Sequence, residues 1–383
     1  MNGRPLDGIT VLSVEQAVAA PFATRQLADL GARVIKIERA GGDFARRYDS
    51  TVHGTSSFFA WLNRGKESVV LDLKDEADAE LFRSIAATAD VVVQNLAPGA
   101  LDRLGLGYDE LAAGNPRLIY AEISGYGTGG SYTRKKAYDL LVQCEAGLLS
   151  VTGTPEQPSK VGASVADIAA GMYVYSGVLA ALIQRGRTGV GDRIEVSMLE
   201  ALGEWMQQPY LFAEYGGRPP QRHGASHATI APYGPFEASD GTVFIGIQNE
   251  TEFAGFCRDV LGAAELADDP RFSLNEHRVA NRDALSELIG AAIAETPSDE
   301  VIRRLDSLAI ANARMRTMPE FSAHPQLAER DRWVEVETPG GPARSLLPPV
   351  TAGSYRPAMK PVPDTGEHTD RIRREFATTE ERN

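Results

Sequence analysis

One aspartate stands in surroundings that suit a reactive carboxylate. Asp167 lies within Gly162–Met172, among small and apolar residues where a helix is predicted to begin. Small neighbours would let a bulky substrate reach the side chain, and a preorganised, partly desolvated carboxylate can act as a covalent nucleophile. The helix dipole alone also favours an aspartate in a first turn. The residue pattern therefore leaves a catalytic role and a structural role open.

A glycine-rich segment, Gly125–Gly130, matches the pattern G-x-G-x-x-G and follows a predicted strand. A dinucleotide site needs this pattern on the first strand–helix turn of a sheet, with an acidic residue about 20 positions later at a strand end. Here the motif follows the fifth predicted strand, and Glu145 lies in a helical pattern. The segment is interpreted as a flexible loop that can move over a ligand.

Other reaction chemistries find little support. His223 and His227 are four residues apart, but the glycine- and proline-rich flanks favour a loop over a zinc-binding helix. The sequence contains neither G-x-S-x-G nor a Walker A motif. Cys144 and Cys257 form no C-x-x-C pair, and so few cysteines suit a reduced, cytoplasmic protein. We therefore expect no metal and no nucleotide redox cofactor.

The elements that position these residues alternate between strand and helix patterns. Short β-branched runs separated by amphipathic runs predict an α/β fold with a doubly wound parallel sheet. The predicted strands are Ile9–Val14, Arg33–Glu38, Ser68–Leu73, Val91–Gln94, Leu118–Ser124 and Arg193–Ser197. Helices are predicted over Asp75–Thr88, over Leu101–Ala113 and over Ala163–Arg185, the last apolar on most faces and expected to be buried.

The composition changes at Gly216–Pro220, which reads as a linker. Beyond it we predict a hairpin over Pro232–Ile247 with its turn at Asp240-Gly241, and then helices over Thr251–Leu261, Arg282–Ala294 and Ser298–Leu308. The predicted organisation is a large α/β domain (1–215), a smaller α+β domain (220–330) and a loop-rich, proline-containing segment (340–383) that returns to the large domain.

Charge and hydropathy limit the partners. The 383 residues include 52 acidic and 39 basic side chains, for a formal net charge of −13, which argues against nucleic-acid binding. No apolar run of about 18 residues is present, so no membrane span is expected. A small anionic ligand needs only a local cluster of Lys and Arg and is not excluded.

Short motifs occur in order along nearly the whole chain. They include Asp29–Ala32, Gly41–Asp43, Asn63–Lys66, Leu71–Lys74, Asn95–Gly105, Asn115–Tyr120, Ser124–Gly127, the Asp167 segment, Arg187–Gly191 and Gly366–Asp370. Each motif alone is weak, but in this order they resemble the family III CoA-transferases. This family includes formyl-CoA:oxalate and carnitine CoA-transferases and the α-methylacyl-CoA racemases.

The resemblance implies a Rossmann-like large domain from both chain ends, a smaller α+β domain and an interlocked homodimer. It also implies that Asp167 attacks the thioester of a donor acyl-CoA to form a mixed anhydride. CoA thiolate then gives an aspartyl-CoA thioester, and the carboxylate of a small acceptor acid reverses the sequence. Coenzyme A is therefore expected as a co-substrate.

Further family positions carry over residue by residue. By resemblance Gln16 and Ala17 belong to a loop that lines the thioester, and Gln16 and Tyr138 join Asp167 in the catalytic set. Four of the positions that hold CoA are cationic here, as its phosphates require. The CoA-holding positions are matched by Arg39, Leu71, Lys74, Asn95, Leu96, Arg103, Leu104, Lys136 and Met198, together with Ala17 and Tyr138.

Tyr138 separates two activities within the family. The racemases that the chain resembles carry a histidine at this position, directly before the counterpart of Asp139, as a second base opposed to the counterpart of Asp167. A phenol, with a pKa of about 10, is poorly matched to reversible proton abstraction near neutrality. CoA transfer is therefore favoured over racemisation or epimerisation. A CoA-binding relative without turnover is a third alternative, against which the presence of Asp167 weighs.

The acid substrate is predicted from a narrower similarity. Ser13–Phe22 together with Arg46–Tyr48 is similar to members that handle C4–C5 dicarboxylates such as succinate, itaconate or mesaconate, so succinyl-CoA is the expected donor. A second carboxylate needs an anchor, for which the candidates are Arg46, Arg47 and His227. The oxalate-type enzymes carry a run of glycines in the smaller domain. His227–Gly234 lacks this run, which argues against oxalate and against a glycine lid.

Overall fold

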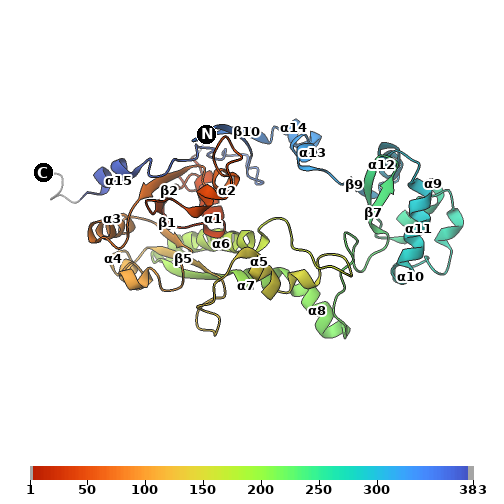
Figure 1. Ribbon diagram of the computed structural model, residues 1–383, viewed down its shortest axis with the longest axis horizontal. Helices are drawn as coiled ribbons and strands as arrows, with labels where there is room; N and C mark the ends of the chain where they lie inside the picture. The colour runs from red at the N-terminus through yellow and green to blue at the C-terminus, as the bar shows by residue number, and fades with distance from the viewer. Residues whose placement is uncertain (1–2, 378–383) are drawn as a thin grey trace. The chain divides into compact units, whose positions relative to one another are not determined.

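The computed structural model describes residues 3–377, which divide into two compact units. The first unit is built from the chain up to Gly147, from Val161–Gln208 and from Leu327 onward, so both ends of the chain contribute to it (Figure 1). The second unit contains Leu148–Lys160 and Pro209–Gln326. Leu148–Lys160 therefore groups with the second unit, although the sequence-based division places it in the large domain.

The first unit is built on a six-stranded sheet with the order β3-β2-β1-β4-β5-β6. All five pairings are parallel, which confirms the predicted α/β class. The order reverses between β1 and β4, and open α/β sheets bind ligands beyond the carboxyl ends of the strands at such a point. The strands are β1 (Thr10–Val14), β2 (Arg33–Glu38), β3 (Lys66–Val70), β4 (Val91–Gln94), β5 (Ile119–Ser124) and β6 (Asp192–Ser197).

Both faces of this sheet are covered. Leu12 and Val14 of β1 belong to a core cluster that includes residues of α3 (Glu76–Ala86) and α4 (Tyr108–Gly114). Val11 points to the other face and is also fully buried. Helices α1 (Ala19–Asp29) and α6 (Val165–Thr188) pack against each other and against strands of the same sheet. Burial on both faces explains why the strands read as continuous apolar runs.

Helices α1 and α6 approach closely at Gly171. A Cβ atom at this position would lie 2.6 Å from the carbonyl oxygen of Ala19 and 3.1 Å from the Phe22 ring, so only glycine fits without a shift. By length and composition α6 could cross a membrane, but it packs within this α/β unit. It is not buried on most faces as expected, because several of its large apolar side chains are exposed: Met172, Tyr173 and Ile183.

The predicted helix over Leu101–Ala113 is wrong, because the chain breaks at Gly105. A short 3-10 helix spans Asp102–Leu104, and Gly105 then has a φ of 63°. This left-handed conformation ends a helical turn and favours glycine. Helix α4 begins only at Tyr108. The remaining helices of the first unit are α2 (Ser57–Leu62), α5 (Asp139–Glu145) and α7 (Met198–Trp205), and α8 (Gln207–Gly216) leads into the second unit.

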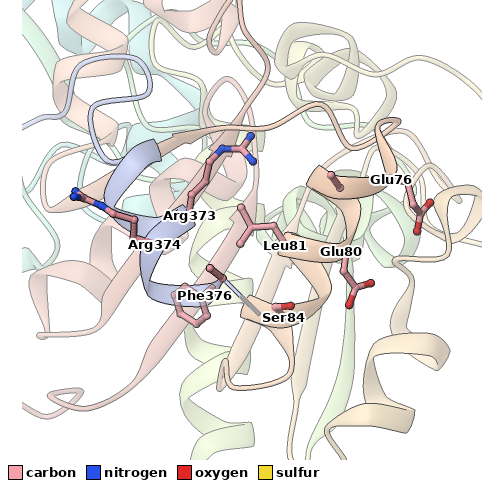
Figure 2. A pocket seen from close by; sticks show the side chains of 9 residues that line it. Glu76, Glu80, Leu81, Ser84, Arg373, Arg374 and Phe376 are labelled. Atoms are coloured by element: carbon pink, nitrogen blue, oxygen red, sulfur yellow. The ribbon is translucent and has the colours of Figure 1, made fainter. Parts of the chain in front are cut away.

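The C-terminal segment is more ordered than its proline content suggests. It includes a hairpin of β10 (Trp333–Thr338) and β11 (Gly341–Leu346) and a final helix, α15 (Thr369–Phe376). Figure 2 shows α15 beside α3, where Ile372 is fully buried in the core. A groove of about 620 Å³ lies between the two helices. None of the site residues predicted from the sequence lines this groove.

The second unit contains a three-stranded antiparallel sheet with the order β7-β8-β9. The predicted hairpin is confirmed, with Ser239 and Asp240 as its two loop residues rather than Asp240-Gly241. The three predicted helices are also present, and the core cluster of this unit joins them to the sheet. The main elements are β7 (Tyr233–Ala238), β8 (Gly241–Gly246), β9 (Ala311–Arg314), α9 (Glu250–Asp259), α10 (Asn275–Ala280), α11 (Arg282–Ile293) and α12 (Ser298–Ser307).

Candidate active site

A cavity of about 530 Å³ opens beyond the carboxyl ends of β1, β4 and β5. Its volume is in the range typical of sites for small molecules. The residues that follow these three strands line it together with the first turn of α6. It brings together many of the side chains that the sequence singles out, namely Gln16, Ala17, Asn95, Leu96, Lys136, Tyr138, Asp167 and Met198. We therefore take this cavity as the candidate active site.

The loop after β1 is fixed at the point where the strand order reverses. The backbone N–H of Gln16 donates to Asn95 Oδ1, and Asn95 Nδ2 donates to the Gln16 carbonyl oxygen, both at 2.9 Å. Ala17 has a φ of 61°, which is uncommon for a residue with a Cβ atom. Its N–H donates to Asp43 Oδ1 at 3.2 Å. Backbone strain of this kind persists only where surrounding contacts hold it in place. Here those contacts fix Gln16 and Ala17, which form part of one wall of the cavity.

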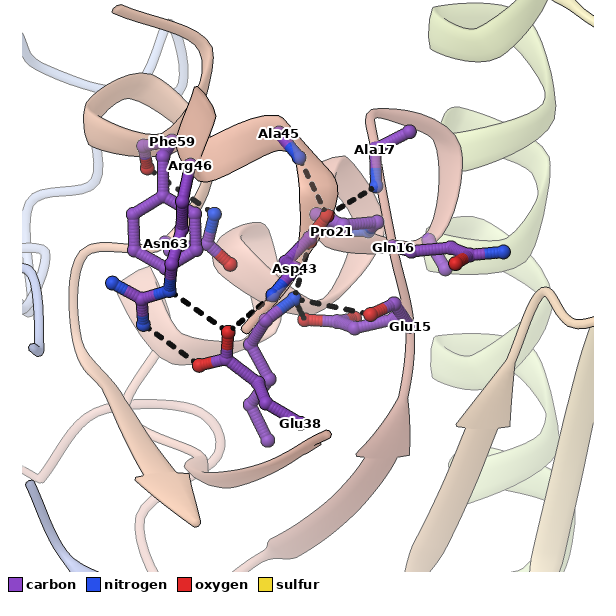
Figure 3. Close-up of polar contacts among 12 residues, drawn as sticks. Glu15, Gln16, Ala17, Pro21, Glu38, Asp43, Ala45, Arg46, Phe59 and Asn63 are labelled. Carbon is purple, nitrogen blue, oxygen red and sulfur yellow. Dashed lines mark hydrogen bonds and ion pairs between the residues drawn. The ribbon is translucent and has the colours of Figure 1, made fainter. Parts of the chain in front are cut away.

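Charged side chains are buried beneath this loop (Figure 3). Lys66 Nζ lies 2.6 Å from Glu15 Oε1, and Lys36 Nζ lies 3.0 Å from Asp43 Oδ2. Arg46 donates to both oxygens of Glu38, at 2.7 and 2.8 Å. Buried charges persist only when paired and hydrogen-bonded. We call this set the buried ion network, and it consists of Glu15, Lys36, Glu38, Asp43, Arg46 and Lys66.

The pKa values within the buried ion network follow from burial and pairing. Burial opposes ionisation of Glu38, but the bidentate Arg46 and the charge of Lys36 hold its pKa at about 2. Burial likewise opposes ionisation of Glu15, but Lys66 and Lys36 lower its pKa. Both carboxylates are therefore ionised at neutral pH. The network acts as a rigid support for Gln16 and Ala17.

Asp167 lies in the first turn of α6 and lines the cavity. Burial and the nearby charge of Asp139 raise the pKa of Asp167 from 3.8 to about 7. Near pH 8 most of the molecules therefore carry an ionised carboxylate that is more basic than an exposed aspartate. A cleft carboxylate with so perturbed a pKa is typical of a functional site.

An aromatic wall was missed by the sequence analysis. Phe44 and Tyr48 both line the cavity, their ring centroids are 5.6 Å apart, and Phe58 meets Tyr48 edge to face at 5.3 Å. Phe44 begins the 3-10 helix Phe44–Arg47, and Tyr48 directly follows its end. The available signal was this pair of aromatic residues on either side of Arg46 and Arg47.

Two of the predicted carboxylate anchors, Arg46 and Arg47, do not line the cavity. Arg46 donates to both oxygens of Glu38, and its guanidinium lies 3.6 Å from the centroid of the Phe59 ring, which argues against a role in binding substrate. Arg47 is exposed and donates to the carbonyl oxygen of Gly41. Its role as a substrate anchor stays a prediction. His227 belongs to the second unit, where it is exposed and stacks on Tyr233.

The other positions proposed for CoA also lie outside the cavity. Arg39, Lys74 and Arg103 are exposed and follow β2, β3 and β4 in the chain, so they lie beyond the same edge of the sheet. Leu71 is buried in the core cluster and Leu104 packs against it. Their side chains therefore contribute to folding, and Leu71 can offer a ligand only its backbone. The three cations remain predictions for the phosphates of CoA.

Comparison with known proteins decides the family. The family model described as CoA-transferase family III matches residues 6–369. The chain belongs to this family. It is 38% identical over 383 residues to acetyl-CoA:oxalate CoA-transferase of Acetobacter aceti, covering 98% of this chain and 97% of that protein.

Two further similarities extend over most of the chain. It is 32% identical over 389 residues to human succinyl-CoA:glutarate CoA-transferase, covering 100% of this chain and 88% of the relative. The crystal structure of a CAIB/BAIF family protein from Brucella suis has a TM-score of 0.88 and 33% identity, covering 98% of this chain and all of that one. The protein is therefore a family III CoA-transferase whose substrates are an acyl-CoA and a carboxylate.

We predict that Gly125→Ala disturbs the wall of this cavity that Lys136, Ala137 and Tyr138 form. A Cβ atom at Gly125 would lie 2.2 Å from the Cβ of Ala137, between Lys136 and Tyr138, so that segment must move. We expect kcat/KM to fall by roughly 10-fold or more, with KM for the acyl-CoA raised. Gly130→Ala is the matched control, because nothing lies within 4 Å of its new Cβ. Equal kcat/KM for Gly125→Ala and the control would contradict this prediction.

We predict that Asp167→Asn stabilises the fold at alkaline pH. The raised pKa means that the folded state binds a proton more tightly than the unfolded state, so ionisation of Asp167 costs stability as pH rises from about 4 to about 7. Above that window the amide should raise the free energy of unfolding by up to about 4 kcal/mol, and below about pH 4 the gain should vanish. Thermal unfolding of the wild type and Asp167→Asn, measured below and above this pH window, tests the prediction. A gain in stability that is independent of pH would refute it.

Proposed function

We propose that the protein transfers CoA from succinyl-CoA or a similar donor to a small dicarboxylic acid, with Asp167 as the covalent nucleophile. The observation that carries this proposal is the partly buried carboxylate of Asp167, with its raised pKa, in a cavity shared with Gln16 and Tyr138. Such a carboxylate is desolvated enough to attack a thioester and accessible enough to be reached by one.

The chemistry conserves the energy of the thioester. A carboxylate oxygen of Asp167 attacks the thioester carbonyl carbon, the C–S bond breaks, CoA leaves as thiolate, and a mixed anhydride of Asp167 and the donor acid remains. The thiolate then attacks the aspartyl carbonyl carbon, expels the donor carboxylate and leaves an aspartyl-CoA thioester. The acceptor carboxylate attacks the carbonyl carbon of this thioester, the C–S bond breaks, and CoA thiolate leaves as a second anhydride forms. Thiolate attack on the acceptor carbonyl then releases the new acyl-CoA and restores Asp167.

Two neighbours are proposed to assist the acyl transfers. Each step builds negative charge on a carbonyl oxygen, and donors fixed in advance stabilise such charge most effectively. The Gln16 amide and the Tyr138 hydroxyl both line the cavity with Asp167. The backbone of Gln16 is already held by Asn95, so its side chain starts from a fixed point. Lys136 lies next to Tyr138 and is proposed to bind a phosphate of CoA.

The acceptor is proposed to be a C4–C5 dicarboxylic acid. The resemblance of Ser13–Phe22 to dicarboxylate-handling members supports this choice, as does a relative named for succinyl-CoA and glutarate. Another relative is named for oxalate, so this shorter diacid belongs in the same comparison. The absence of a glycine run in His227–Gly234 favours the longer acids.

The homodimer implied by the family resemblance is also part of this proposal. Large exposed apolar side chains support it, since monomeric surfaces rarely leave such groups uncovered in number. Those on α6, α7 and α8 include Met172, Tyr173, Ile183, Trp205, Tyr210, Leu211 and Tyr215. Light scattering on the purified protein should give twice the mass of the 41.3 kDa chain.

A competition assay tests the proposed substrates. The enzyme is incubated with succinyl-CoA and equal concentrations of oxalate, glutarate, itaconate, mesaconate and acetate. The new CoA thioesters are then separated, identified by mass and quantified. We expect a C4–C5 diacid to have a kcat/KM at least roughly 10-fold above those of oxalate and acetate. Preference for oxalate would overturn the predicted chain length. Exchange of α-protons with deuterated water when no acceptor is present would instead support the racemase alternative.

A further inference from the structure

The carboxylate of Asp139 is directed at the helix end that carries Asp167. Asp139 Oδ1 accepts a hydrogen bond from the Ala166 N–H at 2.8 Å and a longer one from the Asp167 N–H at 3.4 Å. The residue at the N-cap position of α6, Ser164, makes no side-chain cap. The first N–H groups of a helix need partners from outside the helix. Asp139, from the start of α5, supplies that partner.

Asp139 is itself braced from its own helix. Gln143, one turn further along α5, donates from Nε2 to Asp139 Oδ2 at 2.6 Å. The amide oxygen of Gln143 accepts the Val161 N–H at 3.2 Å, which ties the segment leading into α6 to the same brace. Gln143 is fully buried. Both carboxylate oxygens of Asp139 therefore accept hydrogen bonds, and these bonds fix the orientation of its side chain.

We propose that Asp139 is a positioning residue for the nucleophile: it holds the first turn of α6 and places a second negative charge beside the Asp167 carboxylate. This inference rests on the proposed role of Asp167. It adds a residue that the sequence analysis used only to locate Tyr138. The available signal was an aspartate directly after Tyr138, in a segment already assigned to the site.

The two carboxylates have different surroundings, and this difference assigns their roles. Asp139 accepts three hydrogen bonds, which fix the position of its carboxylate. Asp167 lines the cavity, and burial together with the charge of Asp139 raises its pKa. Asp139 is the fixed charge, and Asp167 reacts.

Other titratable and charged groups line the same cavity as Asp167. The phenols of Tyr48 and Tyr138 line the cavity, as do three cations from one segment, Arg134, Lys135 and Lys136. Lys135 is paired with Glu145 at the far end of α5. Burial is the largest cause of the raised pKa of Asp167, and Asp139 is the second. Loss of the Asp139 charge should therefore lower that pKa without restoring its ordinary value.

The test uses single-turnover formation of the covalent CoA adduct from succinyl-CoA across a pH series. Asp139→Asn keeps an oxygen that can accept the Ala166 N–H but removes the charge, and its amide nitrogen cannot accept from Gln143. We expect the adduct rate near pH 8 to fall about 10-fold and the midpoint of its pH profile to move roughly one unit toward acid. Gln143→Met keeps the charge and removes the brace, so it should lower the rate without moving the midpoint.

Asp109→Asn is the matched control, because it removes an exposed carboxylate from the first turn of α4 and Asp109 does not line the cavity. It should leave both rate and midpoint unchanged. A wild-type rate and midpoint for Asp139→Asn would overturn the inference. A wild-type enzyme that forms no adduct would defeat the proposed function instead. The pH dependence of thermal stability then still decides on Asp139, because the gain from Asp167→Asn should be smaller in the Asp139→Asn background.

Discussion

Replacing Asp167 with alanine is expected to lower the kcat of CoA transfer by at least about 1,000-fold, because the variant lacks the atom that accepts the acyl group. Binding of free CoA should be retained, since Lys136, Leu96 and the rest of the cavity wall are untouched. The measurements are steady-state turnover of succinyl-CoA with a C5 acceptor acid, and calorimetric titration with CoA.

The matched control for this variant is Asp109→Ala, which removes an exposed carboxylate from the first turn of α4. Its turnover should equal that of the wild type. A kcat for Asp167→Ala within 10-fold of the wild type would contradict a nucleophilic role. Loss of CoA binding together with turnover would show that the variant disrupts the cavity rather than the chemistry.

The second large effect is expected at Asp43, the carboxylate that joins the buried ion network to the loop after β1. Asp43→Asn leaves Lys36 facing an amide group in a site where both side chains are fully buried. Breaking a buried pair by removing one charge costs about 3–5 kcal/mol. For a chain of this size we expect Tm to fall by roughly 5 °C. Activity should fall as well, because Asp43 also holds the strained Ala17.

An ion pair on the surface provides the control for Asp43. Glu80 and Arg83 are 2.7 Å apart on α3, and the Glu80 side chain is 57% exposed. Exposed pairs contribute little, so Glu80→Gln should change the free energy of unfolding by less than about 1 kcal/mol. Thermal and urea unfolding of both variants make the comparison. Equal, small changes in the two variants would show that the buried ion network does not support the fold.

Buried parallel strands were the most predictable part of the fold. The runs Arg33–Glu38 and Val91–Gln94 were predicted with the bounds that the structure has. A strand covered on both faces must be apolar along its length, and that pattern is visible without tertiary information. The β10–β11 hairpin was missed because five of its twelve residues are exposed, two are buried, and its apolar pattern is weak.

The buried ion network could not be predicted from sequence patterns, although the sequence contained one indication of it. Lys36 lies in the middle of an apolar strand, and a buried lysine requires a carboxylate partner. Its partners Glu15 and Asp43 come from separate loops, and only the folded chain brings them together. The pairing of Arg46 with Glu38, at the end of β2, was not visible in the sequence for the same reason.

The site itself was predictable in part. The small residues around Asp167 suggested a reachable carboxylate, and the family resemblance gave it a role. The structure brings Gln16, Tyr138 and Asp167 to one cavity. The contacts from Asp139 to the first turn of α6 depend on how α5 packs against that helix, which no local pattern reveals.

Intact-protein mass spectrometry tests the central claim most directly. Wild type and Asp167→Ala are incubated with succinyl-CoA in the absence of any acceptor acid, with and without later borohydride treatment. We predict that the wild type gains the mass of CoA less one water, that borohydride removes this adduct by reducing the aspartyl thioester, and that the variant shows neither change. Turnover of succinyl-CoA without any such adduct, or the same adduct on Asp167→Ala, would contradict the account.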